Sequence, residues 1–388
     1  MRPWFLPAIA AAGVALCHLA AAVGHAHETA NTSVTFDREV SRILSHKCLA
    51  CHADRAIAFP LTSYEQARSW ARAIEEEVLS RHMPPWRAVP GYGVFANDAS
   101  LSTRELQLLV AWIEGNGPKS ADQRIIANID QTRTADRDRL RPPTDRWQLG
   151  RPAWVGTLSG ITVEPNRGDH VRVARLATGF QNPTWVRGVE IRPADRRTVR
   201  AVVLTVAETG QWLGSWTPWH GAVRLPEGSA IRLPAGAHIT VESHYRSAGE
   251  AVDDRTQVGL HLGSQPARCV SDLTLRASSA GPGRVRAEMT LTGDTRVLAM
   301  RPDASTGVRA FDVRARTPDG ATHVLLLVKD PAPEWPTPYI LKTPLALGRG
   351  TTLVVTGHLT GQAPEAQAPS LAVTVSRDVA PACGPASG

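Results

Sequence analysis

The sequence predicts a multidomain protein that combines one small α-helical domain with two all-β domains in tandem. Apolar residues recur at helical spacing between residues 33 and 118. Beyond residue 146, short apolar runs bounded by Gly and Pro are typical of strands. Gly236 and Gly350 each precede such a run, with a histidine eight residues later at His244 and His358. This repeat indicates two similar β-domains.

The length and composition are those of a globular chain. It has 388 residues, of which 43% are hydrophobic and 20% are charged, so two or three domains are expected. The formal net charge of +7 fits either solubility alone or attraction to acidic partner proteins. Lysines and arginines are scattered and do not gather with aromatic residues, so nucleic acid is not an expected partner.

Residues 1–26 are predicted to be a secretory signal peptide. Arg2 precedes an almost wholly apolar run from Phe5 to Val23, and Ala26 is a small residue suited to cleavage. The run is nearly long enough to cross a bilayer, so an uncleaved segment would anchor the chain to a membrane. We expect cleavage and therefore a periplasmic or secreted protein.

The motif Cys48-Leu-Ala-Cys51-His52 is the C-x-x-C-H signature of covalent c-type haem attachment. Its spacing lets two thiols reach the two vinyl groups of one porphyrin. His52 then provides an axial imidazole, a ligand type that suits iron. We therefore expect one covalent haem c. Of the other cysteines, Cys17 lies in the predicted signal. Cys269 and Cys383 either form a disulfide, which an oxidising compartment permits, or remain as two buried thiols.

Three helices are predicted around this motif. The first leads into Cys48, and the second covers roughly Tyr64 to Ser80. The third starts at Ser102, where Glu105 completes a capping box, and ends at Gly115.

The segment Arg81-His-Met-Pro-Pro-Trp86 lies between the second and third helices. Met83 is the candidate sixth iron ligand, because the two prolines stiffen the segment that presents it. A His/Met pair raises the reduction potential and suits electron transfer. The alternatives are that Met83 only fills the core, or that His82 is the ligand, which would lower the potential. His46 is expected at the surface.

Residues 33–118 resemble the small cytochrome c domain that is fused to other periplasmic or cell-surface modules in bacteria. The resemblance is carried by the C-x-x-C-H motif, the segment 81–86, Phe95-Ala-Asn-Asp98, and the stretch from Leu101 to Pro118. Residues 119–145 are polar and charged, and are expected to form a linker or a wrapping arm.

Residues 146–265 and 266–380 are similar to the two domains of the ascorbate-dependent type II copper monooxygenases, the family of the peptide-amidating hydroxylase and dopamine hydroxylase. Bacterial members of this family carry a cytochrome c domain in front. The resemblance implies two jelly-roll-like β-sandwiches, each holding one copper ion. It is carried by residues 185–193, 233–236, 242–249, 254–260, 317–320 and 335–344.

Most of the copper ligands that this resemblance implies are missing. In the first domain, His244 matches the later histidine, but the adjacent histidine pair falls near Arg200-Ala201. In the second domain, the family's His-x-His motif would follow Pro302, but the residues there are not histidines. The family also uses a later methionine, and no methionine follows Met300. Copper usually needs three imidazole or thioether ligands, so bound copper is not expected and His244 is a vestigial ligand.

Strand alternation places His244 on the polar face with Glu242, where it can form a hydrogen bond. Scattered histidines in β-proteins are usually exposed or hydrogen-bonded. Five others could in principle assemble an unrelated copper site: His220, His238, His261, His323 and His358.

We therefore expect an electron-transfer protein, with a haem c domain on a degenerate copper-monooxygenase-like scaffold. Its β-domains would dock a redox partner protein or bind a small-molecule ligand. One alternative is an active copper-dependent monooxygenase that receives electrons from the haem domain. Another is a haem-bearing structural or sensory subunit of a larger complex.

Overall fold

The computed structural model describes residues 32–120, 147–360 and 369–380. The predicted signal peptide, most of the predicted linker, Cys17 and Cys383 lie outside these residues. Among the residues described, no helix is both long and apolar enough to cross a bilayer.

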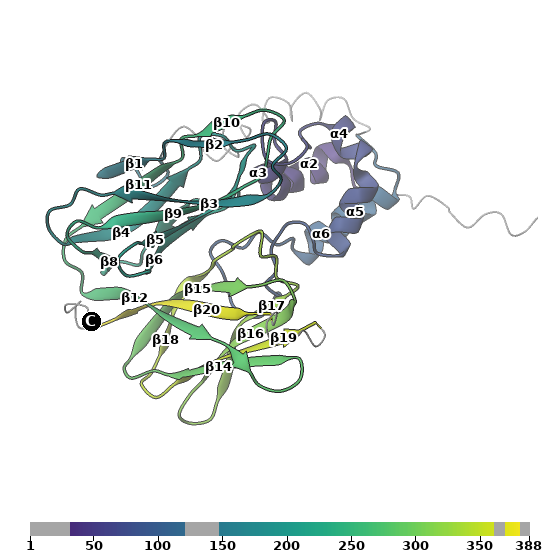
Figure 1. Ribbon diagram of the computed structural model, residues 1–388. Coiled ribbons are helices and arrows are strands. Elements are labelled where there is room, and N and C mark those ends of the chain that lie inside the picture. Colours follow the sequence, from purple (N-terminus) through teal and green to yellow (C-terminus); the bar gives the residue numbers. More distant parts are fainter. Residues whose placement is uncertain (1–31, 121–146, 361–368, 381–388) are drawn as a thin grey trace, which may run out of the picture.

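The helices gather at one end of the molecule (Figure 1). They are η1 (Phe36–Val40), α2 (Ser41–Ile43), η2 (Leu44–Cys48), α3 (Leu49–His52), α4 (Tyr64–Ser69), α5 (Ala71–Leu79) and α6 (Thr103–Glu114). The first four follow one another without a break and form the predicted helix that leads into the C-x-x-C-H motif. The predicted second helix is divided at Trp70. Ser102 and Glu105 form the predicted capping box at the start of α6.

The helices enclose an apolar core of their own. The Phe36 ring contacts Tyr64, with 5.4 Å between ring centroids, and Trp112, with 6.1 Å. Trp112 is fully buried, and its indole N–H donates to the carbonyl oxygen of Pro118. The first and last helices therefore pack together, as the helical pattern of the sequence suggested.

The remainder of the described chain is β-structure, and two β-sandwiches follow each other as predicted (Figure 1). The first sandwich contains β1 (Trp154–Thr157), β2 (Ile161–Val163), β3 (His170–Ala177), β4 (Thr184–Arg192), β5 (Val199–Val206), β6 (Trp212–Trp216), β7 (Ala222–Arg224), β8 (Ser229–Leu233), β9 (His238–Tyr245), β10 (Val252–Asp254) and β11 (Gln257–Gly263). The second contains β12 (Arg268–Arg276), β13 (Ser278–Ser279), β14 (Arg284–Thr290), β15 (Thr295–Ala304), β16 (Val308–Arg316), β17 (Thr322–Lys329), β18 (Tyr339–Leu347), β19 (Thr352–Leu359) and β20 (Leu371–Val379).

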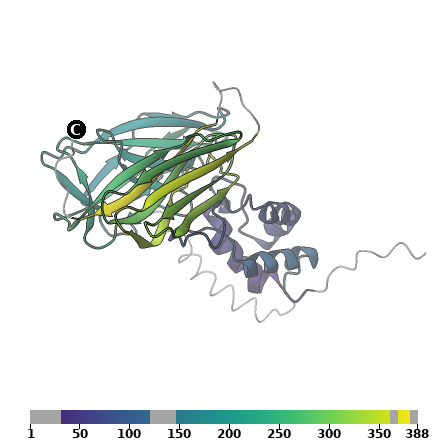
Figure 2. The same cartoon turned by 90° about the horizontal axis from the view of Figure 1, so that it is seen from below.

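Each sandwich has two main sheets. In the first, the order β3-β9-β5-β6 packs against β1-β11-β4-β8, and β7 pairs with β4. In the second, β13-β14-β19-β16-β17 packs against β12-β20-β15-β18. The strands β8 and β12 pair in parallel, through Arg268 with Ser229 and Cys269 with Ala230. Through this pairing, one sheet of the first sandwich continues into one sheet of the second. In Figure 2 the stacked strands lie beside the helices.

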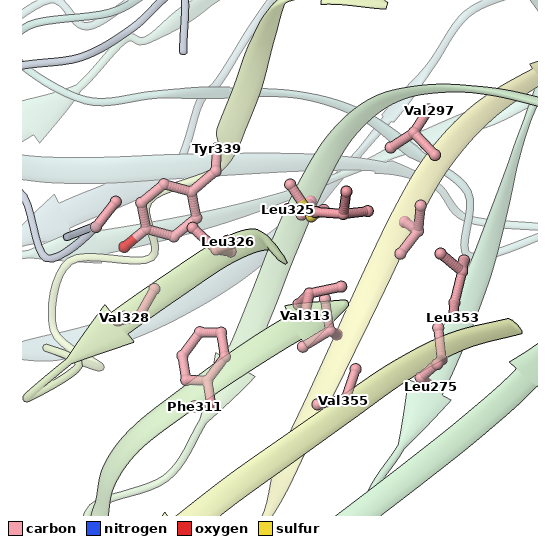
Figure 3. Packing of buried hydrophobic residues seen from close by; sticks show 14 of the residues in the cluster. Leu275, Val297, Phe311, Val313, Leu325, Leu326, Val328, Tyr339, Leu353 and Val355 are labelled. Atoms are coloured by element: carbon pink, nitrogen blue, oxygen red, sulfur yellow. The ribbon is translucent and has the colours of Figure 1, made fainter. Parts of the chain in front are cut away.

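The core of the second sandwich includes residues from the predicted helical domain. Figure 3 shows its centre around Phe311, Val313 and Tyr339. Trp86 and Phe95 are buried in the same cluster, and their rings contact Tyr339 with centroid distances of 5.0 and 5.5 Å. The part of the segment between α5 and α6 that carries Trp86 and Phe95 therefore packs on the second sandwich, because these large aromatic side chains fill that core.

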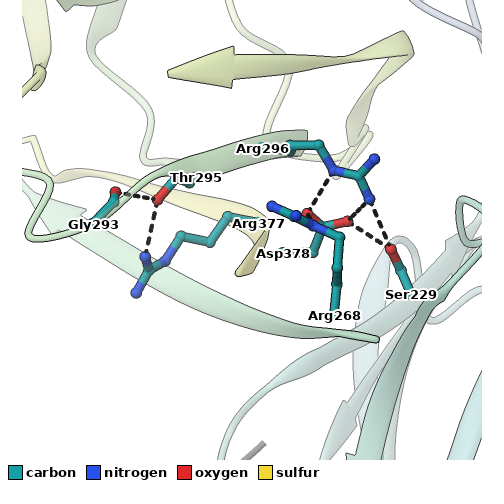
Figure 4. A network of polar contacts seen from close by, with 7 residues as sticks. All are labelled: Ser229, Arg268, Gly293, Thr295, Arg296, Arg377 and Asp378. Carbon is teal, nitrogen blue, oxygen red and sulfur yellow. Dashed lines mark hydrogen bonds and ion pairs between the residues drawn. The ribbon is translucent and has the colours of Figure 1, made fainter. Parts of the chain in front are cut away.

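A buried carboxylate ties the two sandwiches together at the junction of β8 and β12. The side chain of Asp378 is 0% exposed and accepts hydrogen bonds from Arg296, Arg268 and Ser229 (Figure 4). Burial alone would raise the pKa of this carboxyl group. The four hydrogen bonds from these three side chains and the charge of Arg296 outweigh burial, so the pKa lies below its ordinary value.

We expect Asp378→Asn to lower the free energy of unfolding by about 2–3 kcal/mol at neutral pH, because charge-assisted hydrogen bonds are lost from a buried site. Because the folded-state pKa of Asp378 is depressed, its contribution is present above the ordinary aspartate pKa. It is lost as pH falls through the folded-state pKa. Urea unfolding at several pH values measures this. The exposed pair Arg286–Glu288 gives a control: Glu288→Gln should change stability by less than about 0.5 kcal/mol. An equal loss in both variants would contradict the prediction.

Candidate haem-binding site

The three residues of the C-x-x-C-H motif lie on one continuous helical segment. Cys48 ends η2, and Cys51 and His52 belong to α3. A spacing of three residues on a helix places both thiols on the same side. Both cysteines are free and half-buried. The helix therefore presents a pair of thiols beside one imidazole.

Burial raises the pKa of the Cys48 and Cys51 thiols to about 12. At Cys48 the negative charges of a Cys51 thiolate and of Glu105 raise the pKa further, whereas at Cys51 the positive charges of Arg196 and Arg200 oppose the effect of burial. The thiols are therefore protonated at neutral pH. Protonated thiols oxidise slowly to a disulfide, so both sulfur atoms stay available for another reaction.

The orientation of His52 is fixed by its own loop. Nδ1 of the ring lies 2.9 Å from the carbonyl oxygen of Phe59, and the two rings are in edge contact at 4.7 Å. When Nδ1 carries the proton and donates to that oxygen, Nε2 keeps its lone pair. Burial lowers the pKa of His52, which favours the neutral imidazole. A neutral imidazole held from behind by a carbonyl oxygen is the usual form of a histidine metal ligand.

Several large apolar side chains of the helical region remain exposed. Phe59 is 41% exposed and stacks on Trp70, which is 44% exposed, with their ring centroids 4.2 Å apart. Leu79 and Met83 are 55% and 38% exposed at and after the end of α5. The stacked and exposed rings of Phe59 and Trp70 are suited to a binding surface.

Met83 lies in the turn after α5, where its backbone N–H donates to the carbonyl oxygen of Glu77. Its exposure does not fit the alternative that Met83 only fills the core. His82 is also exposed, and its Nδ1 lies 3.1 Å from the hydroxyl of Ser80. His46 is exposed, as expected. No contact joins Met83 or His82 to His52 among the described residues, so the identity of a sixth ligand stays a prediction.

The structure adds one residue that the sequence analysis missed. The guanidinium group of Arg196, in the loop between β4 and β5, donates to the carbonyl oxygen of Ala50 at 3.1 Å and to that of Pro218 at 3.0 Å. Ala50 lies between the two motif cysteines. The first sandwich therefore contacts the motif directly. The sequence gives no signal for this contact, because 146 residues separate its partners.

A second arginine continues this contact region. Arg200 on β5 is only 9% exposed, forms an ion pair with Asp169 at 2.8 Å and lies over the Trp335 ring at 5.1 Å. Trp335 belongs to the second sandwich and also contacts the ring of Trp219. The motif therefore faces a group of arginine and tryptophan side chains where the two sandwiches meet.

His244 lies on β9 opposite Ala201 of β5, the place that the monooxygenase resemblance assigned to a histidine pair. Its Nε2 atom is 2.8 Å from Oε1 of Glu242. This hydrogen bond, together with the charge of Arg301 on β15, lowers the pKa of Glu242. The nitrogen that would bind copper is thus engaged by a carboxylate, and the expected hydrogen bond on the polar face is confirmed.

The five other candidate histidines differ in their surroundings. His238 pairs with Glu208 at 3.0 Å, and burial lowers the pKa of His220 to about 4. His323 and His358 are exposed and His261 is half-buried. Within the described ranges, no three side chains of His, Cys, Asp or Glu form a group that could hold a metal ion. Cys269 is disulfide-bonded, and its expected partner Cys383 lies outside the described residues.

No protein-family model matches the chain, and no curated protein is similar to it. Some solved structures are weakly similar. The major capsid protein P2 of bacteriophage PM2 has 9% identity over 56% of this chain and 96% of its own, with a TM-score of 0.25. PNGF-II has 9% identity over 70% of each chain and a TM-score of 0.25. Oxalate decarboxylase of B. subtilis has 10% identity over 67% and 85%, with a TM-score of 0.14. Scores this low establish no shared fold.

Proposed function

We propose that this protein is a periplasmic or secreted c-type cytochrome that transfers electrons through one covalently bound haem. The haem would be attached at Cys48 and Cys51, with His52 as one axial ligand and Met83 as the other. The two β-sandwiches form a scaffold that resembles a copper monooxygenase but lacks most of its ligands. Haem supplies one-electron redox chemistry when it is bound.

The observation that carries this proposal is the arrangement at the end of the first helix. Two free thiols three residues apart adjoin an imidazole whose Nδ1 is held by the Phe59 carbonyl oxygen. Thioether bonds to the two vinyl groups need the thiols, and iron needs the Nε2 lone pair. The exposed rings of Phe59 and Trp70 beside His52 supply the apolar surface that a porphyrin face requires. The residues present therefore fit haem c.

The protein's own side chains have distinct parts in this proposal. His52 would bind iron through Nε2, and burial, which lowers its pKa, favours the neutral imidazole. Phe59 and Trp70 would shield one side of the bound group from water, which would lower the local dielectric constant and influence the reduction potential. Arg196 holds the backbone between the cysteines against the first sandwich. The attached group would then occupy a fixed position relative to the β-domains, where a redox partner could dock.

The alternative of an active copper-dependent monooxygenase has less support. Copper needs several nitrogen or sulfur ligands, and the strand neighbour of His244 is Ala201. The imidazole Nε2 is occupied by Glu242, and Arg301 places a positive charge nearby. This donor set does not fit copper.

The proposal is tested by metal analysis and absorption spectra of the purified secreted protein. We expect one iron per chain, no stoichiometric copper, and reversible spectral changes on reduction and oxidation. Tightly bound copper at one or two ions per chain would instead support the monooxygenase. Co-purification of a second redox protein at equal amounts would support a subunit of a larger complex.

We expect Met83→Ala to change the spectrum of the oxidised protein and to lower the reduction potential, because a thioether ligand favours the reduced iron. His82→Ala is the matched control: it removes the adjacent exposed side chain and should leave the spectrum as in the parent. The opposite pattern would assign the ligand to His82. Unchanged spectra in both variants would exclude both side chains.

We expect Arg196→Gln to lower the reduction potential of the haem-loaded protein by on the order of 40 mV, because a nearby cation favours the less positive reduced state by about 1 kcal/mol. Redox titration measures this. Arg197→Gln is the control, because Arg197 pairs with Asp195 and Glu250. Equal potentials in the Arg196 variant and the parent would mean that Arg196 does not influence the iron.

A further inference from the structure

A cavity of about 280 Å³ lies where the two sandwiches and the segment between α5 and α6 meet. Its walls come from β6, β7 and β8 of the first sandwich and from β12, β15 and β18 of the second, and Ala96 closes one side. Ligand sites occur preferentially at such junctions between domains. This cavity is small, so it suits a small ligand.

The interior of the cavity is apolar and well ordered by packing. Leu213, Ile231 and Leu298 line it and are 1%, 2% and 6% exposed. Trp212 also lines the cavity. The carboxylate of Asp272, which is not part of the lining, accepts hydrogen bonds from the Trp212 backbone N–H and from the Ser376 hydroxyl, both at 2.6 Å. Both oxygens of Asp272 are thus engaged. The inner part of the cavity therefore offers an aliphatic chain a mostly apolar surface.

Two cations mark the solvent side of the cavity. Arg224 on β7 and Lys342 on β18 are the exposed charged residues of its lining, and no Asp or Glu belongs to the lining. Neither side chain forms an ion pair within the described parts of the chain. These two exposed cations of the lining come from different sandwiches, and either is complementary to an anionic head group.

We propose that this cavity binds an amphipathic monocarboxylate of the medium-chain fatty acid class. The aliphatic tail lies against Leu213, Ile231 and Leu298, and the carboxylate pairs with the exposed cations of the lining, Arg224 and Lys342. Burial of the tail provides most of the affinity, at about 0.8 kcal/mol for each buried CH₂ group. The cations select the anion and set its orientation. This site is independent of the proposed haem, because it uses none of the residues that would hold haem.

The test is calorimetric titration of the full secreted protein with octanoate, octanol and octylammonium. We expect saturable binding of one octanoate per chain, weaker binding of octanol and the weakest binding of octylammonium, whose positive charge the two cations repel. In Arg224→Gln/Lys342→Gln, octanoate affinity should fall at least about fivefold, toward that of octanol, because exposed charge pairs contribute up to about 1 kcal/mol each. Lys329→Gln, an exposed lysine of β17 outside the cavity, is the matched control and should bind as the parent does.

A second variant, which fills the opening of the cavity, tests binding without relying on the two cations. Ala96 is exposed on the segment that closes the cavity, so Ala96→Trp fills the opening without entering a packed core. Binding of octanoate and octanol should be lost while thermal unfolding is unchanged. Absence of saturable octanoate binding to the parent, binding that persists in Ala96→Trp, or equal affinity for octanol and octanoate would overturn the proposal.

Discussion

Serine at both position 48 and position 51 will abolish covalent retention of haem completely. Each thioether bond needs a sulfur atom, and a serine hydroxyl does not add to a vinyl group under the same conditions. The two cysteines lie on one side of a helix, next to His52, so no other thiol among the described residues is placed to replace them. Haem-dependent staining of the secreted protein after denaturing electrophoresis measures the retained group.

The control for this experiment is Ala50→Ser, which adds the same hydroxyl group to the same helical turn and leaves both thiols in place. It should retain the haem of the parent. Single Cys48→Ser and Cys51→Ser variants should retain less than the parent, because one thioether bond remains. Staining of the double variant at the level of the parent would contradict attachment at these cysteines.

Trp86→Ala will lower the free energy of unfolding by about 3–5 kcal/mol, the usual range for truncation of a buried tryptophan. Trp86 is 5% exposed, and its ring contacts Phe95 and Tyr339 with centroid distances of 5.8 and 5.0 Å. The truncation leaves a cavity between the inter-helix segment and β18. Chemical denaturation monitored by circular dichroism gives the magnitude.

The region that Trp86→Ala destabilises also tests where the Trp86 side chain packs. Because Trp86 packs in the second sandwich, hydrogen exchange should accelerate in β17 and β18 and stay unchanged in α6. Trp70→Ala is the matched control, since Trp70 is 44% exposed on the helical region and its loss should cost less than about 1 kcal/mol. Acceleration confined to the helices would show that the segment belongs to them instead.

Local patterns of the sequence predicted much of the fold. The capping box at Ser102 and Glu105 depends on residues three positions apart, so it is visible without tertiary structure. The same holds for the helix that leads to Cys48 and for the alternation that places His244 beside Glu242. The repeat of Gly and His spacings pointed to two β-domains, and two sandwiches follow each other in the chain.

Long-range contacts could not be predicted in this way. Trp86 lies in a segment that resembles part of a cytochrome domain, yet its ring is buried against Tyr339, a residue more than 250 positions away. Arg196 looks like any charged loop residue until the fold brings it to the Ala50 carbonyl oxygen. The parallel pairing of β8 with β12 depends on how the sandwiches meet, which no periodicity in either strand specifies.

The most direct test of the proposed function is the intact mass of the secreted protein under denaturing conditions. Covalent attachment at Cys48 and Cys51 predicts a single species heavier than the polypeptide by one haem. A species with the mass of the bare polypeptide, obtained from cells that attach haem to other c-type cytochromes, would contradict the account.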